Sequence, residues 1–235
     1  MPKITDLNEY TTPTFSDILP IVDLVGDETK KITKQSLLKN VESETILIGS
    51  MGNTVSVDED GNFRLNGEAT QWNDLFVPLN QTKVGSNLRP DYNFVEMTYD
   101  FPQNDPTEIL YFNIQVPHTW KQGSVVYPHV HWKQTQNLVP TFKLDYKWFN
   151  IGDIVPETWS TYVMSVETKP YIGSGTHQIN HGVGGIDGVG KTLSSMLLCR
   201  LYRDDNVYTG DALTYQFDIH IMIDSFGSDF EYIKD

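Results

Sequence analysis

Two histidines separated by one residue are the clearest candidates for chemistry in this chain of 235 residues. His129 and His131 lie in a stretch, 126–133, where apolar and polar residues alternate with the period of a β-strand. This alternation places both imidazoles on the same face of the strand. Pairs of imidazoles ligate zinc and iron in proteins, so the first chemistry to weigh here is metal binding.

The surrounding residues match only part of a cupin-type metal site. Gly123, five intervening residues, His129, one residue and His131 reproduce the first half of the cupin motif, but residues 132–136, WKQTQ, contain no acidic ligand. His220 lies on the polar face of a later strand, whereas cupin ligands point into the barrel. We therefore predict no catalytic residue, metal or other cofactor. A cupin-like metal-dependent enzyme acting through His129, His131 and His220 is the alternative.

A phosphate-binding loop is the second candidate site. Residues 185–192, GIDGVGKT, match the pattern GxxxxGK[ST] in full. Such a loop binds phosphate when a buried parallel strand precedes it and a helix follows. The preceding residues 175–184, GTHQINHGVG, do not form such a strand, and strand-like residues follow at 198–203, LCRLYR. The pattern indicates a glycine-rich loop between strands.

Serine catalysis and sugar binding have weaker support. There is no GxSxG motif, and Ser194 and Ser195 are expected in a strand with no identifiable base. Flat aromatic rings stack on sugars, and four aromatic residues are kept as exposed candidates for a glycan platform: Tyr127, Trp159, Tyr162 and Tyr171. A stand-alone glycan-binding module is a further alternative function.

Residues 71–235 consist mostly of segments with a period of two. The clearest alternating segments are 110–116, 126–132, 142–148 and 213–223, with further strands expected at 94–99 and 158–166. Residues 194–203 are apolar on both faces, which predicts a central strand. No long helix is expected, so this region is predicted to be an all-β domain, an antiparallel β-sandwich or jelly roll.

Residues 46–70 are predicted to form a short β neck. Apolar residues alternate on either side of an Asp60-Gly61 turn, and Asn66-Gly67 makes a second turn. A β unit this small has too little apolar area to offset its ordering entropy. Either three copies wrap around one axis, or the hairpin packs on the C-terminal domain. The predicted trimer contacts are Val55, Val57, Phe63 and Leu65.

Residues 1–45 are too few to enclose a core and are rich in turn-forming residues. A short strand is expected at 30–32 and a brief helix at 34–39, with Thr33 as its N-cap. The apolar residues of this segment must be covered by a partner or a neighbouring subunit. They are predicted to dock the chain on that partner, through Ile18, Leu19, Ile21, Val22 and Leu24.

Composition narrows the classes of partner. Seventeen basic and 31 acidic residues give a net charge of -14, so nucleic acid and anionic membrane surfaces should repel the chain. Cys199 is the only cysteine, which rules out an intrachain disulfide and is compatible with a reducing cytoplasm. No apolar run approaches the length of a bilayer span. Neither nucleic acid nor membrane is an expected partner.

Several segments together resemble proteins of bacteriophage particles. Residues 1–40, with ITDL, DILPIVDLVGDETKKIT and QSLLKNV, are similar to N-terminal attachment modules of phage tail and fibre proteins. From Trp72 onward the chain resembles an uncharacterised family of phage and prophage virion proteins, through WNDL (72–75), PHVHW (128–132), IDGVGKTLSSMLLCRLYRD (186–204) and FDIHIMID (217–224).

The resemblance implies a structural part of a virion, such as a tail fibre, head fibre or neck appendage. It implies a homotrimer that is assembled in the host cytoplasm and bound to other virion proteins by residues 1–45. Residues 46–70 would be the neck, and residues 71–235 an outward head for which a host-surface glycan is a candidate ligand. The resemblance brings no catalytic residues to this chain.

Overall fold

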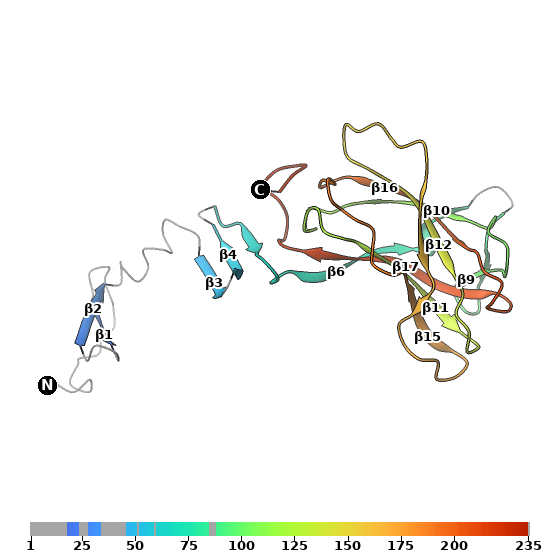
Figure 1. Cartoon of the computed structure of the whole chain (residues 1–235), viewed down its shortest axis with the longest axis horizontal. Coiled ribbons are helices and arrows are strands. Elements are labelled where there is room, and N and C mark those ends of the chain that lie inside the picture. Colours follow the sequence, from blue (N-terminus) through green and yellow to red (C-terminus); the bar gives the residue numbers. More distant parts are fainter. Residues whose placement is uncertain are drawn as a thin grey trace. The chain divides into compact units, whose positions relative to one another are not determined.

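The computed structural model divides the chain into two compact units, Met1–Asn66 and Gly67–Asp235 (Figure 1). It describes residues 18–23, 28–33, 46–50, 52–58, 60–84 and 88–234. Across these residues every named element is a strand, apart from a single 3-10 turn at Leu79–Gln81. The predicted all-β class is confirmed. None of the described helical residues forms a helix long and apolar enough to cross a membrane.

The first strands of the N-terminal unit form an antiparallel pair. β1 (Ile18–Asp23) pairs with β2 (Glu28–Thr33), which contains the strand expected at 30–32. Four of the predicted docking residues, Ile18, Leu19, Ile21 and Val22, lie on β1. Leu24 and the helix expected at 34–39 lie outside the described residues. The docking role stays a prediction.

The second part of this unit is a three-stranded antiparallel sheet of β3 (Ile46–Ser50), β4 (Asn53–Val57) and β5 (Phe63–Leu65). The predicted turn at Gly61 is present, with a positive φ of 86° that favours glycine. The amide of Gly61 closes the turn by donating to the carbonyl of Asp58 at 3.0 Å.

In the C-terminal unit, β16 is the central strand of a five-stranded antiparallel sheet, as its two apolar faces predict. The strands run in the order β13 (Ser160–Met164), β12 (Phe142–Phe149), β16 (Met196–Arg203), β10 (Leu110–Gln115) and β7 (Lys83–Val84).

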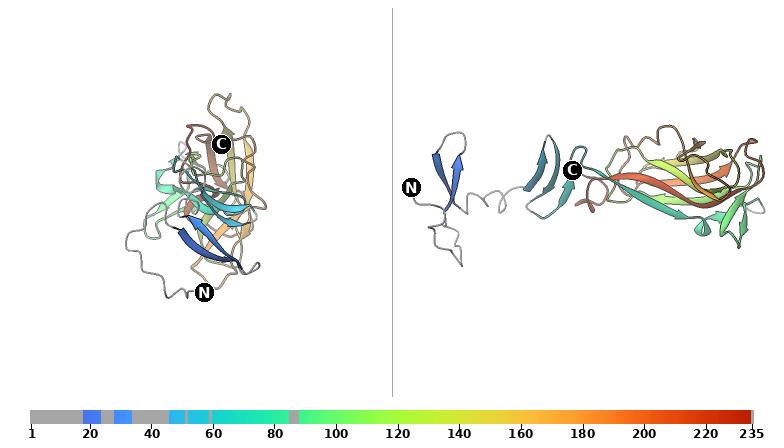
Figure 2. Two further views of the ribbon diagram at one scale, coloured as in Figure 1. Left: turned by 90° about the vertical axis from the view of Figure 1, so that its left-hand side faces the viewer. Right: turned by 90° about the horizontal axis from the view of Figure 1, so that it is seen from below.

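The longest strand, β17 (Ala212–Ile223), organises the opposing seven-stranded sheet. It pairs with β11 along one edge, while β6 and β9 pair with successive parts of its other edge; Figure 2 shows β17 and β6 side by side. The remaining order runs outward from these strands: β14 (Val166–Glu167), β15 (Thr176–His181), β11 (Tyr127–Gln134), β17, β9 (Thr98–Phe101) and β8 (Asp91–Asn93), with β6 (Gln71–Pro78) beside β17.

The hydrophobic core lies between these two sheets. Alternate residues of each strand point inward, so that Phe112 of one sheet meets Phe217 of the other with ring centroids 5.0 Å apart. Aromatic rings and aliphatic side chains fill the layer, among them Phe101, Leu110, Val130, Trp132, Phe142, Leu144, Leu201 and Ile219. The C-terminal unit is an antiparallel β-sandwich of the jelly-roll type, as predicted.

Two local expectations are corrected, and one strand was not predicted. The strand expected at 94–99 begins only at Thr98, because residues 94–97 form a turn in which Phe94 is 86% exposed. The strand expected at 158–166 is divided between β13 and β14. Residues 175–184 form no buried parallel strand, as expected, but they contain the antiparallel strand β15, which was not predicted and whose buried residues are the polar Gln178 and Asn180. Because the buried positions of this strand are polar rather than apolar, alternation of hydrophobic residues in the sequence does not reveal it.

Candidate functional site

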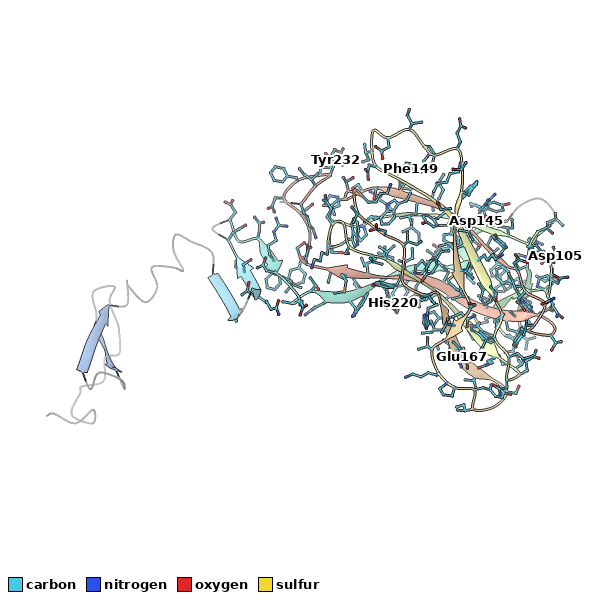
Figure 3. All side chains as sticks on the ribbon, viewed as in Figure 1. Asp105, Asp145, Phe149, Glu167, His220 and Tyr232 are labelled. Atoms are coloured by element: carbon cyan, nitrogen blue, oxygen red, sulfur yellow. The ribbon has the colours of Figure 1, made fainter. Side chains whose placement is uncertain are left out.

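Five of the six histidines gather on the outer face of the seven-stranded sheet. We call this surface the histidine face, and Figure 3 labels His220 on it. Strand pairing brings its members together, since His129 of β11 stands opposite His181 of β15 and Asp218 of β17. The inward residues of the same strands, such as Val130, are buried in the core. The face consists of His129, His131, His177, His181 and His220.

A buried carboxylate lies in the middle of the histidine face. The side chain of Asp218 is only 2% exposed, and its two closest basic side chains within the described residues are both imidazoles. Oδ1 lies 3.3 Å from Nε2 of His131, and Oδ2 lies 3.3 Å from Nε2 of His220. A buried carboxylate is costly unless positive charge or hydrogen bonds compensate it. Asp218 has no lysine or arginine partner in the described part of the chain.

Three buried polar atoms of this cluster lack a hydrogen-bond partner among the described residues: Nδ1 of His129, Nε2 of His131 and Oδ1 of Asp218. The His131 and Asp218 atoms are close to each other, but their orientation does not make a hydrogen bond. Buried polar atoms are satisfied in most proteins, so three unsatisfied atoms in one cluster make it a candidate site for an ordered water or an ion.

The environment of the cluster disfavours the charged form of two of its imidazoles, His129 and His177. Burial, reinforced by the neighbouring His220, lowers the pKa of His129 to about 4. Burial and then the charge of His131 also lower the pKa of His177. The rings of His129 and His220 are only 3.9 Å apart between centroids, so two positive charges there would repel. Neutral imidazoles keep one nitrogen lone pair free to accept a proton or a metal ion.

The sequence placed His129, His131 and His220 on outward faces, and the structure brings them together. It did not single out Asp218 or predict that His177 and His181 join them. The spacing of Asp218 and His220, two residues apart in an alternating strand, was an available signal. His177 and His181 could not be placed, because β15 itself was not expected.

The phosphate-loop pattern is a connection within the sandwich. Its residues run from a bridge between Ile186 and Val126 into turns and then directly into β16, with no helix after the loop. The amide of Lys191 donates to Gly188, and its Nζ atom donates to the carbonyl of Trp148 at 2.9 Å. The lysine that would bind phosphate therefore holds the loop onto β12.

Ser194 has a histidine partner that the sequence did not reveal. It lies before β16 rather than within it, with a positive φ of 58°, and its Oγ is 3.0 Å from Nε2 of His118. Nδ1 of His118 contacts Oγ of Ser228 at 2.6 Å. However, the amides of Ser194 and Ser195 already donate to the carbonyls of Val116 and Thr192, so neither is free to form an oxyanion hole. These contacts tie the C-terminal segment to the sandwich.

Of the four aromatic candidates for a glycan platform, Tyr162 is corrected because it is buried, whereas Tyr127, Trp159 and Tyr171 are half-buried. Tyr162 is buried, and its hydroxyl donates to the carbonyl of Gly184. The hydroxyl of Tyr171 donates to the backbone carbonyl of Thr135. Trp159 is covered by the guanidinium of Arg200, 4.0 Å from the ring centroid. Tyr127 meets the edge of Trp72. The prominently exposed aromatic residues of the sheet are instead on β6, where Trp72 is 59% and Phe76 is 64% exposed.

The predicted neck residues share one face of the three-stranded sheet. Val55 stands opposite Leu65, and Val57 stands opposite Phe63, in the antiparallel register. Leu65 is buried, whereas the other three are half-buried. Ile48 of β3, directly opposite Val55, is 68% exposed. The sheet therefore has an apolar face that this single chain does not fully cover.

Comparisons with known proteins do not assign the chain to a family. No family model matches it, and no curated protein does. One solved structure, described as the structure of Eiger TNF from S. frugiperda, has 14% sequence identity and a TM-score of 0.25. The match covers 69% of this chain and 98% of that one. A TM-score this low does not establish a common fold.

Proposed function

We propose that the chain is a structural subunit of a bacteriophage virion, a short homotrimeric fibre or appendage. Residues 1–45 attach the chain to the particle, residues 46–70 form the trimeric neck, and the β-sandwich of residues 71–235 faces outward toward a host-surface or virion partner. The observation that carries this proposal is the partly exposed apolar face of the β3–β5 sheet. The sequence resemblance to phage virion proteins supplies the biological setting.

A sheet of this size gains stability when copies pack together. Fully burying an aliphatic side chain contributes about 1.5–3 kcal/mol relative to leaving it exposed. Ile48 is largely exposed and Val55 and Val57 are half-buried, so most of that gain is still open in one chain. A closed threefold arrangement lets the same face of each copy cover the others without leaving an open edge.

A groove at the edge of the β-sandwich supports the same assembly. It has a volume of about 810 Å³ and lies between β6 and β10, beside the exposed Phe76. Apolar side chains line much of it, including Leu75, Val77, Phe112, Ile114 and Leu198. Contiguous apolar surface of this kind marks protein contacts. A neighbouring copy would cover both the groove and Phe76.

Light scattering on the full-length protein tests the trimer. We expect a mass about three times the 26.8 kDa of one chain. Ile48→Asp places a charge on the apolar face of the three-stranded sheet and should yield monomers. The matched control is Ile154→Asp, which changes an isoleucine that is 94% exposed in the C-terminal unit and should leave the trimer intact. A monomeric wild-type protein would contradict the trimer.

The virion assignment has its own test. Mass spectrometry of purified particles from the phage that encodes the chain should detect its peptides at a copy number divisible by three. Deleting residues 1–45 should abolish incorporation into particles while the remaining protein stays folded. Full incorporation of the truncated protein would contradict attachment through the N-terminal unit.

A further inference from the structure

We infer that His129, Asp218 and His220 form a binding site for a divalent transition-metal ion on the histidine face. One ligand atom from each residue lies within 4.8 Å of the others. The inference stands on this geometry and does not depend on the proposed virion role, because all three residues belong to the C-terminal unit of one chain.

The donor set selects the class of ion. Two imidazole nitrogens and one carboxylate oxygen suit zinc, and also iron, cobalt or nickel, whereas calcium and magnesium prefer oxygen ligands throughout. Zinc sites with three protein ligands leave a further position for water or another ligand. Zinc–nitrogen bonds of about 2.0–2.1 Å require the three side chains to turn slightly inward. We therefore assign zinc as the reference ion for the site.

The sheet holds the three ligands in place. His129 and Asp218 are directly opposite each other in the register of β11 and β17. His220 follows Asp218 by two residues, so it projects from the same face of the same strand. Core residues on the other face of both strands, such as Val130 and Ile219, anchor the backbone. The ligands thus come from the interior of the sheet rather than from loops.

The electrostatics of the cluster favour a cation. Among the residues that the structure describes, the carboxylate of Asp218 is buried with only imidazoles close to its oxygens, and both its Oδ1 and Nδ1 of His129 lack hydrogen bonds. A bound metal ion supplies the missing positive charge and gives lone pairs of this cluster a partner.

Neighbouring residues are placed to support the ligands. Nδ1 of His131 contacts Nε2 of His177 at 3.0 Å, and Nε2 of His131 faces Asp218. On β6, Oδ1 of Asp74 lies 3.3 Å from Nε2 of His220. Contacts of this kind orient metal ligands and raise affinity.

Zinc titration of the full-length protein tests the site. The protein is first stripped with a chelator, and calorimetry then measures zinc binding at pH 7.5. We expect one saturable zinc ion per chain and a rise in Tm of about 5–10 °C at zinc concentrations near 100 times Kd. Cobalt is the spectroscopic probe, since protein-bound Co²⁺ with nitrogen ligands gives visible absorption bands.

Variants separate this site from the histidines around it. His220→Gln and Asp218→Asn should each weaken zinc binding at least about tenfold and remove the cobalt bands. His181→Gln is the matched control, because it changes a histidine of the same face that lies outside the three-residue site. It should bind zinc like the wild-type protein.

Two outcomes would overturn the inference. Folded wild-type protein without one-to-one zinc binding or cobalt bands excludes the site, even if a variant fails to fold. Equal loss of binding in His220→Gln and His181→Gln would mean that zinc binds diffusely to surface imidazoles. Neither result would bear on the trimer, which light scattering of the metal-free protein measures separately.

Discussion

Nε of Arg203 donates a 2.6 Å hydrogen bond to Oδ2 of Asp205, inside a guanidinium site that is completely buried. The other four N–H groups of Arg203 also find acceptors, in the second oxygen of Asp205 and the carbonyls of Phe101, Gly210 and Tyr208. This one side chain joins the end of β9, at Phe101, to the loop between β16 and β17 that contains Asp205, Tyr208 and Gly210. The pair therefore stabilises the end of the sandwich.

Removing the guanidinium of Arg203 should strongly destabilise the folded protein. Arg203→Met leaves Asp205 buried without its charged partner, and breaking such a pair lowers the free energy of unfolding by about 3–5 kcal/mol. Urea denaturation measures the change. Lys143→Met is the control, since the Lys143–Asp204 pair is partly exposed and should contribute at most about 1 kcal/mol. Similar losses in the two variants would show that the burial of Arg203 has no special effect.

The Arg203–Asp205 pair should also make the stability of the protein depend on pH in the acidic range. Burial alone would raise the pKa of Asp205, but hydrogen bonds from Arg203 and from the amides of Tyr208 and Thr141 lower it below the ordinary 3.8. The unfolded chain then binds the proton more tightly than the folded one. The contribution of Asp205 is complete above about pH 4 and is lost as pH falls through the folded pKa. The stability gap between wild type and Asp205→Asn should narrow only in that acidic range, and a gap independent of pH would contradict this.

Gly188 of the phosphate-loop pattern should matter for packing. A Cβ atom at this position would lie 2.2 Å from the carbonyl oxygen of Ser124 and 2.7 Å from Cζ2 of Trp120. We expect Gly188→Ala to lower the free energy of unfolding by about 1–3 kcal/mol, as overpacking does. Thermal denaturation compares it with Gly227→Ala, whose added Cβ meets nothing within 4 Å. Equal stability of the two variants would contradict a packing role.

The buried amide of Asn180 should be a second sensitive position. Its Oδ1 accepts from Nε1 of Trp132 at 2.8 Å, and its Nδ2 donates to the carbonyl of Pro140 at 2.6 Å. Asn180→Leu leaves Nε1 of Trp132 and the carbonyl of Pro140 buried without hydrogen bonds. This change should lower the free energy of unfolding, measured by chemical denaturation, by about 2–4 kcal/mol. Asn137→Leu, at an exposed loop position after β11, should change stability by less than about 0.5 kcal/mol. If Asn180→Leu lowered the free energy of unfolding as little as the control does, the hydrogen bonds of Asn180 would not stabilise the fold.

The sequence alone determined those features that depend on neighbouring residues. Alternation in 142–148 and 213–223 identified β12 and β17 and the faces they bury, because a strand repeats every two residues. The same rule placed His129, His131 and His220 on outward faces. The apolar character of 194–203 located the central strand β16, and glycine at position 61 identified a turn, since glycine readily adopts positive φ.

Only the tertiary structure decided which of these faces meet. Asp218 becomes a buried partner of His129 because β11 and β17, almost ninety residues apart in the chain, pair in one particular register. The sequence did not predict β15 because its buried residues, Gln178 and Asn180, are polar. Hydrogen bonds to residues far apart in the sequence satisfy their buried amides. Local alternation assigns a side chain to a face, whereas burial and proximity depend on strand order and register. Those are set by packing between segments far apart in the sequence.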